Sequence, residues 1–213
     1  MFLYGNTKNP YRVWIALHGY GQLAEFFSKK FSILNSEKNL VICPEGLHRF
    51  YRNGYSGRVG ASWMTKEARE DDIRDNNLWM NHVREYVQTH YPESEVVLLG
   101  FSQGAATALR WLSHSAFYIQ HLVIYASVFP PDVTPDASFS QKVKGQIFFV
   151  AGTQDEFMNE SERKHQIDRL YNFGLCPEVL EYEGKHDIDS DVLLQLEKKM
   201  GSVKNTEALT PFC

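Results

Sequence analysis

Ser102, Asp155 and His186 are residues of the types that together can carry out nucleophilic acyl transfer. A serine hydroxyl is a weak nucleophile until an adjacent imidazole accepts its proton. A carboxylate then holds that imidazole in the required tautomer and stabilises its cationic form. The three residues are far apart in the sequence, so this chemistry depends on a fold that brings them together. The structural alternative is three unrelated loop residues.

Ser102 lies at the centre of residues 100–104, GFSQG, which match the G-x-S-x-G pattern of a nucleophile elbow. The apolar run 96–99 precedes this pattern, and the helix formers of 105–111 follow it. This order favours a buried strand, a tight turn and a helix. The Ser102 hydroxyl would then lie at a helix N-terminus, where free N–H groups favour an oxyanion. A plain strand-to-helix turn that contains a serine is the alternative.

Asp155 and His186 also follow predicted strands, over 146–151 and 178–182. Catalytic groups collect at the carboxyl ends of strands in open α/β sheets. The chain order of serine, acid and histidine is that of the α/β-hydrolases, and it differs from the chymotrypsin and subtilisin orders. Glu156 and Asp187 are the competing acids, and Asp155 is preferred because it follows its strand most closely.

A further strand, over 12–18, leads into a loop that can aim backbone N–H groups at an anion. In hydrolases with a nucleophile elbow, one oxyanion donor comes from this loop and the other from the residue after the nucleophile. This assigns the oxyanion hole to the main-chain N–H groups of Tyr20 and Gln103, with Gly21 as the alternative to Tyr20. His18 is expected to shape the loop by bonding a nearby backbone group.

These residues need a scaffold in which strands alternate with helices. The hydrophobic pattern predicts strands over 12–18, 39–43, 96–99, 120–125, 146–151 and 178–182, and helices over 23–34, 70–90, 105–111, 160–173 and 190–200. Such alternation predicts an α/β fold with a mostly parallel central sheet and helices on both faces. We expect a single domain over 1–213, and the short connections argue against a large cap domain.

Two segments are expected to be irregular and to border the site. Residues 44–65 hold many aromatic side chains and glycines, and long loops of this kind are often functional. We assign Trp63 and Met64 to the wall of an apolar acyl or aryl pocket. Phe129, in the proline-rich connection 126–141, is assigned to the same pocket. The alternative is that these side chains simply pack under their loops.

The composition is that of a globular protein, with 43% hydrophobic and 23% charged residues in a chain of 213. A formal net charge of −4 gives no indication of a nucleic-acid or anionic-membrane partner. Asp187, Asp189 and Asp191 alternate like a calcium loop, but Val192 and Lys198 occupy the positions that need glycine and glutamate. We therefore expect no metal and no cofactor.

The first residues show no basic start followed by a long apolar run, so no signal peptide is expected. No apolar run is long enough to span a bilayer. Three cysteines, Cys43, Cys176 and Cys213, are more typical of reduced thiols than of a disulfide framework. These features predict a cytoplasmic protein without stable membrane insertion, and a homodimer is possible.

The chain resembles the carboxylesterase/phospholipase branch of the α/β-hydrolases, which holds small esterases, lysophospholipases and acyl-protein thioesterases. The resemblance covers essentially the whole chain. Its motifs are LHGYGQ at 17–22, GFSQG at 100–104, AGTQDEF at 151–157 and GKHDI at 184–188.

This resemblance implies Ser102 as nucleophile, Asp155 as acid and His186 as base, with Tyr20 and Gln103 N–H groups as the oxyanion hole. The family usually has a second glycine where this chain has Ala105, and often valine-proline where it has Phe157-Met158.

We therefore expect a serine hydrolase that acts on small-molecule acyl esters with short to medium acyl chains. The alternatives are a thioesterase, a lysophospholipase, a peptidase or a catalytically silent binding protein with a hydrolase fold.

Overall fold

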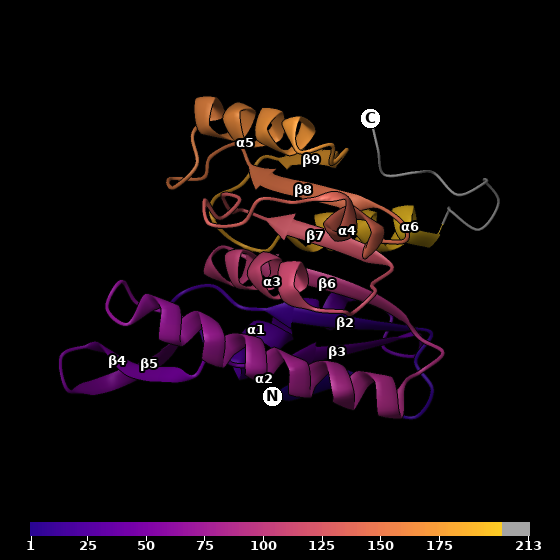
Figure 1. Ribbon diagram of the computed structural model, residues 1–213. Helices are drawn as coiled ribbons and strands as arrows, with labels where there is room; N and C mark the ends of the chain where they lie inside the picture. Colours follow the sequence, from indigo (N-terminus) through magenta and orange to yellow (C-terminus); the bar gives the residue numbers. More distant parts are fainter. Residues whose placement is uncertain (202–213) are drawn as a thin grey trace.

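The computed structural model describes residues 1–201 and consists of a seven-stranded sheet covered by helices, with a separate two-stranded hairpin (Figure 1). The strands are β1 (Phe2–Gly5), β2 (Arg12–Leu17), β3 (Asn39–Cys43), β4 (His48–Asn53), β5 (Ser56–Ser62), β6 (Glu95–Phe101), β7 (His121–Tyr125), β8 (Ile147–Gly152) and β9 (Glu178–Tyr182). The helices are α1 (Ala24–Ser28), the 3-10 helix η1 (Lys29–Ile33), α2 (Arg69–His90), α3 (Gln103–His114), α4 (Ala137–Gln141), α5 (Glu160–Asn172) and α6 (Ser190–Gly201).

The sheet has the order β1-β3-β2-β6-β7-β8-β9, and all of its neighbouring strands pair in parallel except β1 with β3. Parallel strands need crossover connections, which place helices on the faces of the sheet. The expected mostly parallel α/β fold is thus confirmed. The antiparallel edge strand β1 was not expected from the sequence.

Both faces of the sheet are buried, which explains why its central strands are apolar without alternation. Successive residues of β2 point to opposite faces: Ile15 packs in one core cluster and Trp14 in the other. The first cluster also contains side chains from α2, α3 and α5, and the second contains side chains from α1 and α6. Figure 1 shows the same division of the helices. The catalytic candidates therefore stand on a sheet that is fixed from two sides.

Residues 44–65 are not irregular, because β4 and β5 within them form an antiparallel hairpin that pairs His48 with Ser62. The two strands are mostly exposed, so they lack the apolar pattern of a core strand. The signal in the sequence was Gly54 at the first position of the two-residue loop 54–55, since a tight hairpin turn of type II′ has glycine there. Gly54 has a positive φ of 61°, as such a turn requires. Figure 1 shows the hairpin on the side toward which the parallel strands point.

Smaller departures concern one helix and the cysteines. The connection 126–141 was expected to be non-regular but contains the short helix α4. Cys43 is a buried free thiol. Cys176 is disulfide-bonded, contrary to the expectation of reduced thiols, and Cys213 lies outside the described residues. Among the helices of residues 1–201, none combines the length and the apolar character needed to cross a membrane.

Candidate active site

Ser102 occupies a sharp turn between β6 and α3 with φ 53° and ψ −122°. A non-glycine residue with such angles costs about 1–3 kcal/mol and persists only where its surroundings fix it. Two hydrogen bonds fix it here: Ser102 N–H donates to the Tyr125 carbonyl at 2.9 Å, and the Ser102 carbonyl accepts from Ala105 N–H at 2.9 Å. The neighbouring strand and the new helix therefore both hold the serine in this conformation.

The two glycines that flank Ser102 allow α3 to lie directly against the sheet. A Cβ atom at Gly100 would lie 2.2 Å from Ala105 Cα, and one at Gly104 would lie 2.4 Å from the Leu17 carbonyl oxygen. Both distances are far below van der Waals contact with backbone that cannot easily move. Any side chain at these positions would displace the turn that presents Ser102.

The structure brings Ser102, His186 and Asp155 together at the carboxyl ends of three different strands. His186 Nε2 lies 2.9 Å from Ser102 Oγ, and His186 Nδ1 lies 2.7 Å from Asp155 Oδ2. The Asp155 side chain is fully buried, and its second oxygen accepts a hydrogen bond from Phe157 N–H at 2.8 Å. This chain of contacts lets the imidazole accept the serine proton while the carboxylate holds its Nδ1–H.

The competing acids are placed elsewhere. Glu156 is exposed, and the Asp187 carboxylate forms an ion pair with Lys30 at 2.6 Å. The cap of the last helix is provided by Asp189, which accepts a hydrogen bond from Val192 N–H at 3.0 Å. Asp155 is the carboxylate that contacts the His186 ring.

Two phenylalanines hold the His186 ring in place. Phe101 packs below it with the ring centroids 4.9 Å apart, and Phe157 contacts it edge-on at 4.8 Å. Phe157 is 73% exposed, so it forms an apolar wall beside the imidazole that faces solvent. Phe157 was not expected from the sequence to border the pocket. Its position two residues after the acid was the available signal.

The two N–H groups predicted as oxyanion donors lie outside the hydrogen bonding of the helices and strands. Gln103 is the first residue of α3, so its N–H has no intrahelical acceptor. Tyr20 lies in the loop after β2, and its neighbour Gly21 donates its own N–H to the Ala61 carbonyl at 2.8 Å. The Gly21 N–H is thus engaged with the hairpin, which favours Tyr20 over Gly21 as the candidate oxyanion donor of this loop.

His18 fixes the orientation of the peptide that carries the Tyr20 N–H. Gly46 N–H donates to His18 Nε2 at 3.0 Å, so Nδ1 carries the ring proton and donates to the Gly19 carbonyl at 2.8 Å. The Gly19 carbonyl and the Tyr20 N–H belong to one trans peptide and point in opposite directions. Burial lowers the pKa of His18, which keeps the ring neutral and both hydrogen bonds intact.

Trp63 lies beneath this loop and does not line an open pocket as expected. It is 0% exposed, its indole N–H donates to the His18 carbonyl at 2.8 Å, and its ring lies 5.1 Å from the His18 ring. The Gln103 side chain accepts a hydrogen bond from Trp63 N–H at 3.1 Å and donates to the Met64 carbonyl at 2.9 Å. Trp63 therefore supports the site from below.

Phe129 also lies away from the expected pocket. It is 1% exposed and packs edge-on against Phe139 in the core. Met64 is half-buried, and its sulfur lies 3.4 Å from the Arg110 guanidinium. The assignment of Met64 to the pocket stays a prediction.

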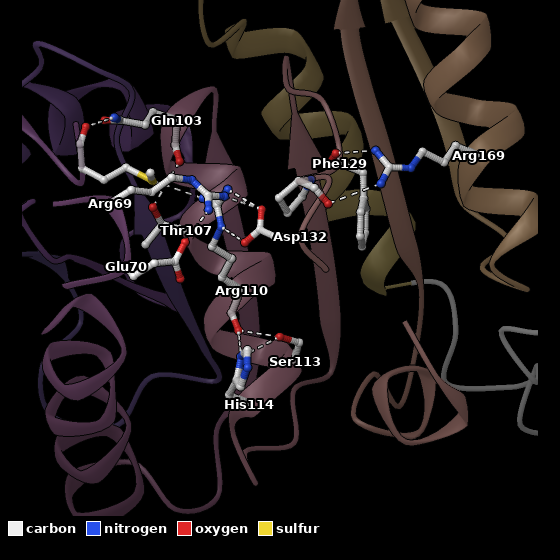
Figure 2. A network of polar contacts seen from close by, with 12 residues as sticks. Arg69, Glu70, Gln103, Thr107, Arg110, Ser113, His114, Phe129, Asp132 and Arg169 are labelled. Carbon is white, nitrogen blue, oxygen red and sulfur yellow. Dashed lines mark hydrogen bonds and ion pairs between the residues drawn. The ribbon is translucent and has the colours of Figure 1, made fainter. Parts of the chain in front are cut away.

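A partly buried ion pair next to Met64 ties α3 to the loop after β7 (Figure 2). Arg110 binds Asp132 through two nitrogens, at 2.8 and 2.9 Å, and Arg69 reaches the same carboxylate at 2.7 Å. The Arg110 guanidinium holds the pKa of Asp132 well below its usual range. This network helps to hold α3, the helix that begins directly after Ser102, in place.

A cleft of about 630 Å³ lies between α1 and the hairpin, beside the oxyanion loop. It is lined by Gly21, Gln22, Leu23, Phe26, Phe27, Lys30, Arg52, Arg58 and Val59. Clefts of this volume accommodate small organic ligands. Within residues 1–201, no group of three or more His, Cys, Asp or Glu side chains is arranged to hold a metal ion.

Comparison with known proteins gives one family match and several structural matches. The family model described as serine hydrolase (FSH1) matches residues 11–191. No curated protein matches the chain significantly.

Three solved structures illustrate the structural matches. Acyl-protein thioesterase 2 of Zea mays is 18% identical, with a TM-score of 0.71 and coverage of 94% of this chain and 97% of that one. The Bacillus cereus carboxylesterase is 16% identical, with a TM-score of 0.67 and coverage of 94% and 92%. Esterase PE8 is 15% identical, with a TM-score of 0.66 and coverage of 93% and 97%. At these identities the matches establish a shared fold.

Proposed function

The chain belongs to the serine hydrolase (FSH1) family, and we propose that it cleaves carboxylic esters through an acyl-enzyme intermediate on Ser102. The observation that carries this proposal is the continuous contact from Ser102 Oγ through His186 to Asp155, at 2.9 and 2.7 Å. A serine placed on a strained elbow, next to an imidazole that contacts a buried acid, is an activated nucleophile.

In the first half-reaction, Ser102 Oγ attacks the ester carbonyl carbon while His186 Nε2 accepts the hydroxyl proton. The buried Asp155 carboxylate stabilises the imidazolium that forms. Negative charge develops on the carbonyl oxygen, where the Tyr20 and Gln103 N–H groups are available as donors. Collapse of the tetrahedral intermediate breaks the ester C–O bond, and His186 gives its proton to the departing alcohol.

In the second half-reaction, water attacks the acyl-enzyme and His186 accepts a proton from it. The second tetrahedral intermediate uses the same oxyanion donors. Its collapse releases the carboxylic acid, and the proton held by His186 returns to Ser102 Oγ. The cycle therefore needs only this chain, the ester and one water molecule.

The preferred substrate class is a small-molecule acyl ester. A second candidate is a thioester, which passes through the same steps with a thiol as leaving group. The likeness in fold to the Zea mays acyl-protein thioesterase favours keeping this candidate. Hydrolysis of an oxygen ester and a thioester with the same acyl group would rank the two classes by their kcat/KM values.

An active-site fluorophosphonate tests the proposal against a silent binding protein. We expect one adduct per chain on the wild type, none on Ser102→Ala, and loss of nitrophenyl ester turnover in the same variant. Ser127→Ala is a matched control because Ser127 also follows a strand of the sheet and is largely buried. Labelling that survives Ser102→Ala, or a wild type that reacts with neither reagent, would contradict the proposal.

A further inference from the structure

The cleft between α1 and the hairpin has no role in the triad chemistry described above. Its lining combines apolar side chains with cationic ones. One wall consists of the apolar side chains of Leu23, Phe26 and Phe27. Three cationic side chains also line the cleft: Arg52 and Arg58 belong to the hairpin, and Lys30 belongs to η1, which directly follows α1. None of the described residues that line the cleft is acidic.

Three contacts connect this cleft to the candidate active site. Gly21 lines the cleft and directly follows Tyr20 in the oxyanion loop. Phe27 lines it as well and packs 6.1 Å from the Phe101 ring, which itself lies under His186.

The third contact is the ion pair of Lys30 with Asp187, the residue after His186. The cleft is therefore bordered by the oxyanion loop on one side and by the histidine loop on the other.

Arg52 and Arg58 differ from the other cations of this region in having no acidic partner. Lys30 is paired with Asp187, and Arg49 of the same hairpin is paired with Glu45 at 2.6 Å. Arg52 and Arg58 form no ion pair with any residue in the described part of the chain. The whole chain has a formal net charge of −4, so this local excess of positive charge runs against the overall balance.

The pairing of the hairpin makes the two arginines neighbours. Tyr51 pairs with Val59 and Asn53 pairs with Ser56, and the register shifts between these two pairs, so Arg52 and Arg58 lie near each other across the strands at that shift. Like charges opposite each other destabilise a strand pair. Nothing among the surrounding described residues offsets this repulsion, whereas an anion between the two side chains would.

Arg52 also lies close to the oxyanion loop. Its Nε atom would be 3.8 Å from a Cβ atom at Gly21, and Phe50, two residues earlier, stacks on the Tyr20 ring at 5.1 Å. The hairpin thus holds a guanidinium next to the peptide that we assign to transition-state stabilisation. A ligand with its ester at Ser102 can extend past Tyr20 toward Arg52.

We propose that this cleft is a subsite for an anionic group of the substrate, with Arg52 and Arg58 binding a carboxylate or phosphate and the α1 side binding an apolar chain. The inference rests on the proposed function, because it assigns a substrate class to the same site. Arginine binds such planar or multivalent oxyanions through paired N–H groups. The substrate class is then an amphiphilic acyl ester with a negative charge several bonds from the ester.

The charge can belong to the acyl part or to the leaving group, and two pairs of esters separate these sources. The acyl pair is the mono-nitrophenyl ester of hexanedioic acid against nitrophenyl hexanoate. The leaving-group pair is 4-carboxyphenyl hexanoate against phenyl hexanoate. For each pair we measure the ratio of kcat/KM for the anionic ester to kcat/KM for the neutral ester.

We expect the wild type to prefer the anionic member of one pair, and Arg52→Gln and Arg58→Gln each to lower that ratio about five- to tenfold, as for one hydrogen-bonded charge contact. High salt should lower it as well. Arg74→Gln is the matched control, since Arg74 is exposed on α2 and paired with Asp71 at 2.9 Å. Its ratio should equal that of the wild type.

Calorimetric binding of the same four esters to folded Ser102→Ala gives a result that does not depend on turnover. An anionic preference there that is lost in Ser102→Ala/Arg52→Gln/Arg58→Gln supports the subsite even if the proposed reaction is wrong. Equal binding of anionic and neutral esters, or unchanged ratios in both arginine variants, overturns the subsite. In that case turnover of the neutral esters that depends on Ser102 would leave the proposed function standing.

Discussion

The strand-end region around Ser102 and the cleft beside the hairpin differ in how completely their polar groups are satisfied. The side chains of His186 and Asp155 are largely buried, and each of their ring nitrogens and carboxylate oxygens contacts a partner. Arg52 and Arg58 are exposed and have no acidic partner in the described chain. The first region is complete without a ligand, whereas the second acquires partners only when a ligand binds.

This difference suits the strand-end region to catalysis and the cleft to substrate selection. Preorganised groups in a water-poor site stabilise a transition state without having to rearrange. Groups at an open rim can be exchanged with little effect on folding, because exposed substitutions change stability by only a few tenths of a kcal/mol. We therefore expect substitutions in the strand-end region to affect turnover and those in the hairpin to affect substrate choice.

The largest effect should follow from Asp155→Asn, which keeps the shape of the side chain but favours the wrong tautomer of His186. The corresponding change lowers kcat roughly 10⁴-fold in the serine protease case, and we expect a loss of several orders of magnitude here. Steady-state hydrolysis of a nitrophenyl ester measures it. Glu156→Gln and Asp187→Asn are controls that should stay within about tenfold. Near-normal activity of Asp155→Asn would move the acid elsewhere.

The next effect concerns His18, which acts through the Gly19–Tyr20 peptide and not on the substrate. His18→Leu removes the Nδ1–H donor, so the peptide can turn and withdraw the Tyr20 N–H from the oxyanion hole. Loss of one such donor lowers kcat by about 10²–10³-fold. We expect kcat to fall with little change in KM.

His18→Asn provides the control, because its amide can donate to the Gly19 carbonyl from a similar position. It should recover part of the activity that His18→Leu loses, at comparable thermal stability. If both variants lose activity and stability together, His18 serves only the core.

A smaller effect is the loss of stability in acid from buried neutral histidines. Burial lowers the pKa of His18, and it lowers the pKa of His121 to about 4, where His121 Nδ1 accepts a hydrogen bond from Gln146 N–H. In the unfolded chain both histidines have a pKa of about 6.5, so below that pH the unfolded state binds more protons than the folded state. Stability should be full above about pH 6.5 and fall by about 1.4 kcal/mol per pH unit for each histidine below it, until the pH reaches the folded-state pKa of that histidine, which is about 4 for His121.

Denaturant unfolding at a series of pH values measures this slope. His121→Gln should remove its share, and His82→Gln, a change at an exposed position, should leave the slope unaltered. A slope that is the same in His121→Gln and the wild type would show that His121 is not a buried neutral group.

The smallest effect is a gain in stability from the hairpin. Arg58→Glu replaces a like-charge neighbour of Arg52 with an opposite charge, and such a cross-strand pair contributes about 0.2–1 kcal/mol. The variant should unfold at a slightly higher denaturant concentration at low salt and lose this advantage at high salt. A destabilised Arg58→Glu would mean that Arg58 has a structural role, and the contrast between the two regions would weaken.

The sequence predicted the fold and located the candidate triad residues because both depend on local patterns. Apolar strands covered on both faces are continuous runs, and the elbow places Ser102 between a strand and a helix regardless of distant contacts. The order of the strands then brings Asp155 and His186 to the same edge of the sheet.

The pocket residues could not be predicted in the same way. Trp63 directly follows β5, and Phe129 lies in the loop after β7. The direction of each side chain depends on strand register and on partners such as His18. The hairpin was missed because its exposed strands lack apolar alternation. Arg52 and Phe157 face the site only as a result of that tertiary arrangement.

The most direct test of the account is the mass of the protein during turnover of an activated ester, quenched within the first catalytic cycle. Deacylation limits such reactions, so the acyl-enzyme accumulates. We predict that the intact chain gains the mass of one acyl group and that peptide mapping places it on Ser102. Turnover without any covalent intermediate, or an acyl group on another residue, would contradict the account.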